Sequence, residues 1–220
     1  MCRVGLEPGQ SVLDVGCGTG AFLRLAARRG ALASGLEAAP ALAAAARSRA
    51  PAADVRVGTA DALPWPDDAF DLVVGLQSFF FGGDAAALLR EAARVARPGA
   101  TIVVQVPGPR ERCDLEAVRI LVRPLMAVRP LAPELWRDGA LEALAGAAGL
   151  APECAFDTSW AYEFADAATA GRAMLAAAGI AGAHLETVRA TVVRGLERFR
   201  TPAGGYRLFN TYRYLVARAT

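Results

Sequence analysis

The stretch Val12–Gly20 reads VLDVGCGTG, and this part of the chain decides the fold. Its apolar first half is typical of a buried strand, and its three glycines allow a tight turn before a helix expected from Gly20 to Arg29. The free backbone N–H groups at the start of such a helix attract anionic or oxygen-rich groups. The stretch therefore predicts a strand, a glycine-rich turn and a helix that leave room for a ligand.

Short apolar runs alternate with alanine-rich amphipathic stretches from Ser11 to Val106, which is typical of a parallel sheet covered by helices. The pattern predicts strands at Ser11 to Val15, Leu32 to Leu36, Asp54 to Val57, Phe70 to Leu76 and Thr101 to Val106. It predicts helices at Gly20 to Arg29, Ala41 to Arg49 and Ala85 to Ala96, the last stopped by Pro98. An α/β fold is therefore expected.

After Val106 the alternation of apolar runs and amphipathic stretches changes. Residues 107–133 hold five prolines and one short apolar helix near Leu115 to Val122. The remaining expected elements are a helix at Glu134 to Ala148, a strand at Glu153 to Phe164, helices at Ala167 to Ala178 and Ala183 to Phe199, and a strand at Tyr206 to Arg218. We expect one domain over residues 1–220, with 107–133 and 167–199 inserted as caps.

The composition narrows the class of protein. Of the 220 residues 54% are hydrophobic and 21% charged, which indicates a globular chain. A net charge of +2 argues against a general nucleic-acid binder, and the cysteine spacing with a single histidine predicts no metal site. No apolar run reaches the roughly 18 residues that span a bilayer, and no signal peptide is evident, so we expect a cytoplasmic protein without a membrane span.

A candidate ligand contact follows the second expected strand. Glu37 stands 21 residues after Gly16, where a carboxylate can accept hydrogen bonds from both hydroxyls of a ribose. Gly16, Gly18 and Ala21 also satisfy the G-x-G-x-x-G/A dinucleotide fingerprint. These residues by themselves leave NAD and other adenosine cofactors open.

The continuation separates these cofactors. Residues 58–74 read GTADALPWPDDAFDLVV, and residues 88–99 read LLREAARVARPG. With the glycine turn, they make the stretch from Gly5 to Val106 closely resemble the class I S-adenosylmethionine-dependent methyltransferases, especially the small-molecule branch of ubiquinone and menaquinone biosynthesis. The resemblance implies a Rossmann-like, seven-stranded, mostly parallel sheet in the order 3-2-1-4-5-7-6. Strand seven would be antiparallel and would correspond to Tyr206 to Arg218.

The same resemblance implies the cofactor, S-adenosyl-L-methionine, its product, S-adenosyl-L-homocysteine, and a set of contacts. Gly16, Gly18 and Gly20 would surround the methionyl part, and Asp14 would orient the turn and approach the amino group. Glu37 would hold the ribose. The other implied contacts are Asp61 to the adenine amino group, Ala62 through its backbone, Ala38 and Leu63 as walls of the adenine site, and Gln77 and Ser78 beside the sulfonium.

The acceptor side is less specific. Phe79 and Phe80 could line an apolar acceptor site or build core, and Tyr162 and Tyr206 could face the acceptor or pack. No general base can be named. We expect a methyltransferase acting on a small, partly apolar molecule, with no nucleic-acid partner.

Three alternatives stay open. A nucleic-acid or protein methyltransferase is one, although residues 76–79 read LQSF where an N-P-P-Y motif would stand. A catalytically inactive cofactor-binding protein is the second. An NAD-dependent oxidoreductase is the third, and it would need a Tyr/Lys or His arrangement in a chain that has no Lys.

Overall fold

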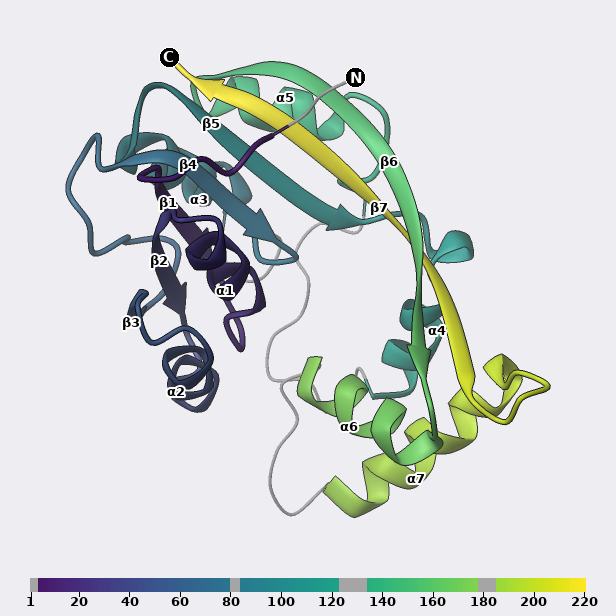
Figure 1. Ribbon diagram of the computed structural model, residues 1–220. Helices are drawn as coiled ribbons and strands as arrows, with labels where there is room; N and C mark the ends of the chain where they lie inside the picture. The colour runs from purple at the N-terminus through teal and green to yellow at the C-terminus, as the bar shows by residue number, and fades with distance from the viewer. Residues whose placement is uncertain (1–3, 80–83, 123–133, 178–184) are drawn as a thin grey trace. The chain divides into compact units, whose positions relative to one another are not determined.

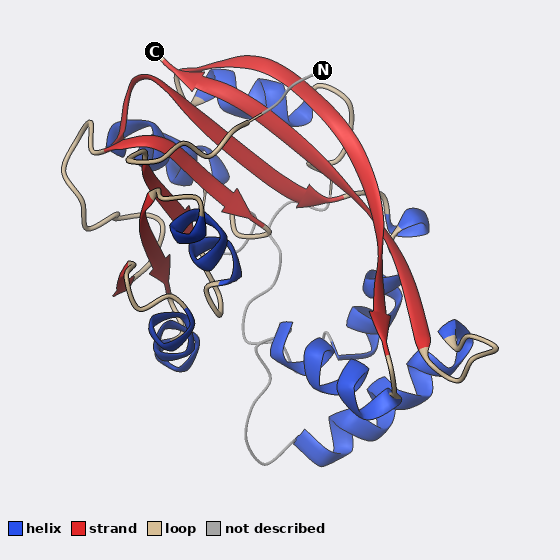
Figure 2. Ribbon diagram, viewed as in Figure 1, coloured by secondary structure: helices blue, strands red, loops and turns tan. Residues whose placement is uncertain are grey.

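The computed structural model describes residues 4–79, 84–122, 134–177 and 185–220. Seven strands form one sheet in the order β3-β2-β1-β4-β5-β7-β6, with β7 antiparallel (Figures 1 and 2). The strands are β1 (Ser11–Val15), β2 (Leu32–Glu37), β3 (Asp54–Val57), β4 (Phe70–Leu76), β5 (Ala96–Pro107), β6 (Leu150–Phe164) and β7 (Tyr206–Ala219). The predicted fold class and strand order are confirmed.

Seven α-helices and two short 3-10 turns are described. They are α1 (Ala21–Arg28), α2 (Pro40–Arg49), α3 (Ala85–Val95), η1 (Arg110–Arg112), α4 (Asp114–Val122), α5 (Ala140–Ala147), α6 (Ala167–Ala177), α7 (Leu185–Leu196) and η3 (Glu197–Phe199). Most lie within one or two residues of the predicted ranges, because their amphipathic periodicity is a local property of the sequence.

Three predicted boundaries need correction. The strand expected from Glu153 begins at Leu150, directly after Gly149 at φ +80°, because Leu150 is buried in the core. The strand expected from Thr101 begins instead at Ala96, directly after α3. The reason is Pro98, which favours extended backbone at the residue before it, with Gly99 at φ +78° absorbing the irregular register. The helix expected from Glu134 begins only at Ala140, because its N-cap Gly139 adopts a left-handed conformation at φ +80°.

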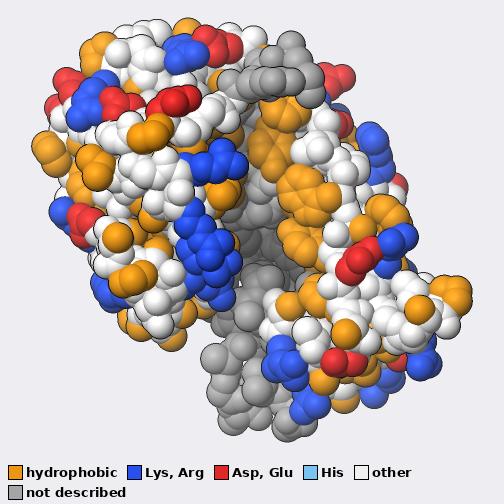
Figure 3. Space-filling model, viewed as in Figure 1, with side chains coloured by type: hydrophobic (Ala, Val, Ile, Leu, Met, Phe, Trp, Pro, Cys, Tyr) orange, Lys and Arg blue, Asp and Glu red, His pale blue; other side chains and the backbone are white. Residues whose placement is uncertain are grey.

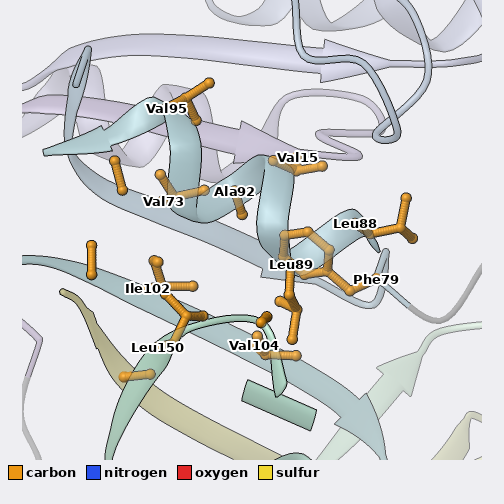
Figure 4. Close-up of a cluster of buried hydrophobic side chains, with 14 of the residues drawn as sticks. Val15, Val73, Phe79, Leu88, Leu89, Ala92, Val95, Ile102, Val104 and Leu150 are labelled. Carbon is orange, nitrogen blue, oxygen red and sulfur yellow. The ribbon is translucent and has the colours of Figure 1, made fainter. Parts of the chain in front are cut away.

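Two hydrophobic layers cover the two faces of the sheet. On one face, side chains of α3 and α5 pack with those of β1, β4 and β5 (Figure 4). On the other face, α1 and α2 pack with the opposite side chains of β1, β2 and β4. Burial on both faces explains why the central strand β4 reads as a nearly continuous apolar run rather than an alternating one.

The chain forms two compact units. The first comprises residues 1–106, 130–156 and 213–220, and the second comprises residues 107–129 and 157–212. The second unit has its own cluster of buried side chains, contributed by α4, α6, α7 and the adjoining part of β7. Within the described residues, no helix is long and apolar enough to cross a membrane.

Candidate functional site

The glycine turn lies between β1 and α1. Gly16, Gly18 and Gly20 all adopt positive φ, at +74°, +54° and +78°. The backbone N–H groups of Gly16 and Cys17 both donate to the carbonyl oxygen of Leu36, at 2.8 and 2.9 Å, which fastens the turn to β2. A Cβ at Gly16 would lie 2.5 Å from that of Ser78, whereas one at Gly18 would meet no atom within 4 Å. The turn is therefore packed at Gly16 and open at Gly18.

Glu37, at the end of β2, binds this turn through its carboxylate. One carboxylate oxygen accepts from the backbone N–H of Gly18 and the other from that of Ala39, each at 2.9 Å. A carboxylate offers about four lone-pair sites, so both oxygens retain capacity for further donors. The structure thus brings two predicted site residues, Glu37 and Gly18, into direct contact.

Asp14 lies beneath the turn, near the end of β1. It is 3% exposed, and its Oδ1 is buried without a hydrogen-bond partner among the described residues. Burial, and then the negative charge of Glu37, raise the pKa of Asp14 to about 7. A buried carboxyl group in this state favours a cationic or hydrogen-donating ligand.

The loop between β3 and β4 begins next to Glu37. The backbone N–H of Gly58 donates to the Glu37 carbonyl at 3.2 Å. Asp61 and Ala62 are exposed, while Leu63 is 4% exposed and packs in the core. Asp61 is therefore presented to solvent from a loop whose two flanks are held in place.

The end of β4 carries a strained backbone. Gln77 has φ +67°, a conformation uncommon for a residue other than glycine and enriched at functional sites. Its backbone N–H donates to the carbonyl of Gln105 on β5 at 3.2 Å, and the next residue, Ser78, packs against Gly16. The Nε2 of Gln77 and the Oγ of Ser78 are buried without partners among the described residues. Leaving such groups unpaired costs about 1–3 kcal/mol each, which a ligand could offset.

The surface beside the turn is basic. Arg49 at the end of α2 donates from Nη1 to Oγ1 of Thr19 at 2.7 Å, and Arg24 and Arg28 are exposed on α1. Figure 3 shows basic side chains gathered over α1. Of these residues Arg49 contacts the turn itself, and its charge favours an anionic group, such as a carboxylate, near the helix start.

The aromatic residues considered for the acceptor site differ in burial and in their contacts. Phe79 is 1% exposed and packs in the cluster of Figure 4, with its ring where a Cβ of Gly75 would lie. Tyr206 is 4% exposed, and its hydroxyl donates to Glu197 at 2.8 Å. Tyr162 is 38% exposed, and both tyrosines belong to the second unit. Phe80 lies outside the described residues.

Sequence reasoning missed two contacts near the site. Glu91 and Arg94 of α3 bind the backbone of the loop that carries Asp61. Gln105 at the end of β5 is 5% exposed, and its Nε2 donates to the hydroxyl of Tyr214 on β7. The spacing of Glu91 and Arg94 indicates a helical ion pair, but nothing local identifies the loop that the pair binds.

Comparison with known proteins identifies the family of the domain that carries this site. Residues 13–104 match the model of a methyltransferase domain. The 27-O-demethylrifamycin SV methyltransferase of Amycolatopsis mediterranei is 33% identical over 166 residues, covering 70% of this chain and 58% of that protein. The chain carries a class I S-adenosylmethionine-dependent methyltransferase domain. The recognition made from the motifs is confirmed.

Other proteins similar to this chain are also methyltransferases. The demethylmenaquinone methyltransferase of Tropheryma whipplei is 36% identical over 107 residues, covering 47% of this chain and 44% of that protein. The chain thus spans about half the length of these curated relatives. Geranyl diphosphate C-methyltransferase from Streptomyces coelicolor, solved with Mg²⁺, geranyl diphosphate and S-adenosyl-L-homocysteine, shares the fold at a TM-score of 0.58 and 16% identity. That likeness covers 97% of this chain and 74% of the other.

Proposed function

We propose that the protein transfers a methyl group from S-adenosyl-L-methionine to a small, partly apolar acceptor. The observation that carries the proposal is a set of buried polar atoms around the glycine turn that have no hydrogen-bond partner in the described part of the chain, namely Asp14 Oδ1, Gln77 Nε2 and Ser78 Oγ. They occupy the carboxyl ends of β1 and β4, where ligands bind in open α/β sheets. Their mixture of acceptor and donors suits a zwitterionic, amino-acid-bearing cofactor.

The residues present fit that cofactor. Asp14 would accept from its amino group, and Gly16, Gly18 and Gly20 would surround the methionyl part. Glu37, whose oxygens retain lone pairs, would accept from the ribose hydroxyls. The adenine would lie against Ala38, the backbone of Ala62 and the loop at Leu63, with Asp61 accepting from its amino group, and Gln77 and Ser78 would flank the sulfonium.

The bound cofactor supplies an electrophilic methyl group on a positively charged sulfur. A nucleophilic atom of the acceptor forms a bond to that carbon while the carbon–sulfur bond breaks, and its electron pair stays on the sulfur of S-adenosyl-L-homocysteine. The protein's part is to align the three atoms, which can supply about 7–11 kcal/mol of the barrier reduction in ideal cases. A general base would add roughly 10²- to 10⁴-fold.

The proposal also covers the chemical class of the acceptor. The proposed acceptor is a small molecule rather than a nucleic acid, and Tyr162 is a candidate contact. The caps expected over residues 107–133 and 167–199 stay a proposal, and residues 123–133 and 178–184 lie outside the described residues. A cytoplasmic location is part of the proposal. The inactive cofactor-binding protein is the second candidate, because a fold and a cofactor site do not by themselves establish turnover.

Calorimetric titration with S-adenosyl-L-methionine, S-adenosyl-L-homocysteine and NADH tests the cofactor. We expect saturable binding of the two sulfur compounds alone, weakened by Glu37→Ala and by Asp61→Ala. NADH binding in their place would overturn the proposal. Acceptor-dependent formation of S-adenosyl-L-homocysteine across a panel of phenols, carboxylic acids and quinols then separates the enzyme from the inactive binder.

A further inference from the structure

Arg94 of α3 makes five hydrogen bonds through one guanidinium group. Nε and Nη2 donate to the two carboxylate oxygens of Glu91 at 2.8 and 2.9 Å. The same group donates to the backbone carbonyls of Leu63 and Trp65, each at 3.0 Å, and to Oδ1 of Asp67 at 2.7 Å. A planar guanidinium can satisfy acceptors in several directions at once, which an ammonium on a flexible stem does not reproduce.

Glu91 adds a further bond that attaches the loop between β3 and β4 to α3. Its Oε2 accepts from the backbone N–H of Leu63 at 2.9 Å, so both polar backbone groups of Leu63 are bound by α3. The hydrogen bonds to Arg94, with that to Leu63, hold the pKa of Glu91 below its usual value. The side chains of Arg94 and Glu91 are 32% and 23% exposed, so water screens this pair less than an open surface pair.

The attachment fixes the part of the loop next to Asp61. On one side, the backbone N–H of Gly58 is bound to β2, and that of Ala62 donates to the Thr59 carbonyl at 3.3 Å. On the other side, Leu63 is held by Glu91 and Arg94. The exposed pair Asp61 and Ala62 therefore lies between two anchored points, and α3 holds this part of the loop through the backbone of Leu63.

We propose that Arg94, acting with Glu91, is a positioning residue that sets the base selectivity of the cofactor site by fixing the backbone that carries Asp61. The inference rests on the proposed function, in which Asp61 accepts from the adenine amino group. A carboxylate on a loop that can shift discriminates poorly, because it can retreat from a carbonyl oxygen placed where the amino group should be. A carboxylate on a fixed loop must face that oxygen unpaired, so the wrong base is rejected.

The test compares two ligands that differ at one position of the base. S-adenosyl-L-homocysteine carries the amino group, and S-inosyl-L-homocysteine carries an oxo group in its place. We expect the unsubstituted chain to prefer the adenine compound by about tenfold or more, the effect of one hydrogen bond to a charged group. In Arg94→Lys this preference should fall by at least about threefold, and Glu91→Gln should lower it in the same direction.

Arg97→Lys is the matched control. Arg97 donates to Asp71, which accepts from the backbone N–H of Ser11 at 2.8 Å, so this pair also joins an arginine, a carboxylate and a backbone amide. The Arg97–Asp71 pair lies at the start of β1 and β4, at the opposite end of the loop from Asp61. We expect both arginine substitutions to lower the urea midpoint of unfolding, and only Arg94→Lys to change the base preference.

A double substitution separates positioning from general loosening. If Arg94 acts through Asp61, Arg94→Lys should leave the base preference unchanged once Asp61→Ala is present. A full base preference in Arg94→Lys, or none in the unsubstituted chain, overturns the inference while binding of S-adenosyl-L-homocysteine still supports the proposed function. Failure of the unsubstituted chain to bind S-adenosyl-L-homocysteine overturns both.

Discussion

The carboxylate of Glu37 lies near enough to the buried carboxyl group of Asp14 to raise its pKa, adding to the larger effect of burial. The pKa of Asp14 is about 7, so in the ligand-free protein this group changes charge near neutral pH. The two acidic groups thus lie in different environments. Asp14, near the end of β1, is buried, whereas Glu37, at the end of the neighbouring β2, accepts hydrogen bonds from backbone amides.

The first prediction concerns pH and cofactor affinity. If Asp14 accepts from the amino group of S-adenosyl-L-methionine, its charged form binds the cofactor better. Affinity should rise as pH increases from about 6 to about 8, by up to about tenfold per unit below the pKa. Calorimetry across this range measures the slope. Asp14→Asn should abolish it, and an affinity independent of pH in the unsubstituted chain would contradict the proposed contact.

The second prediction concerns stability. The pKa of Asp14 is higher in the folded state, at about 7, than the ordinary value of 3.8, so the folded state binds the proton more tightly. This group therefore makes the free energy of unfolding fall as pH rises from about 4 to about 7. Asp14→Asn should therefore stabilise the ligand-free protein by about 4 kcal/mol more at pH 8 than at pH 4. Urea unfolding at both pH values checks this, and equal effects would contradict it.

The third prediction concerns the glycine turn. Gly16→Ala places a Cβ 2.5 Å from that of Ser78 at a positive φ, so it should lose both stability and cofactor binding. Gly18→Ala has the same kind of backbone conformation but open space, so its cost in stability should be near 1–2 kcal/mol. Thermal unfolding of the two variants separates packing from backbone strain. Equal loss of stability in both would show that the contact with Ser78 is unimportant.

The fourth prediction concerns Phe79. Its burial beside Leu88 and Leu89 indicates a core side chain, so Phe79→Ala should lower the free energy of unfolding by about 3–5 kcal/mol. Phe79→Leu should cost less, because it leaves a smaller cavity. Denaturant titration measures both. A change below about 1 kcal/mol in Phe79→Ala would instead fit a side chain that serves the acceptor.

The local motifs and the long-range contacts differ in how far the sequence predicted them. The strand bounds of β1, β3 and β4 follow from apolar runs, and the positive φ values of the glycine turn follow from its composition. The burial of Phe79 did not follow, because it depends on how remote residues pack. The late start of α5 has a local cause, the left-handed Gly139, which the expected helix from Glu134 overlooked. The hydrogen bonds of Arg94 to a loop about thirty positions earlier likewise leave no periodic trace.

The sequence by itself determined the alternation of strands and helices, the glycine turn, the acid at the end of β2 and the acid in the loop after β3. Each is encoded within a few residues, through side-chain periodicity and backbone freedom. Only the tertiary structure decided that Glu37 binds the amide of Gly18, that Asp14 is buried, and that α3 holds the loop of Asp61. These contacts join residues far apart in the chain, so they exist only once the sheet has brought its strand ends together.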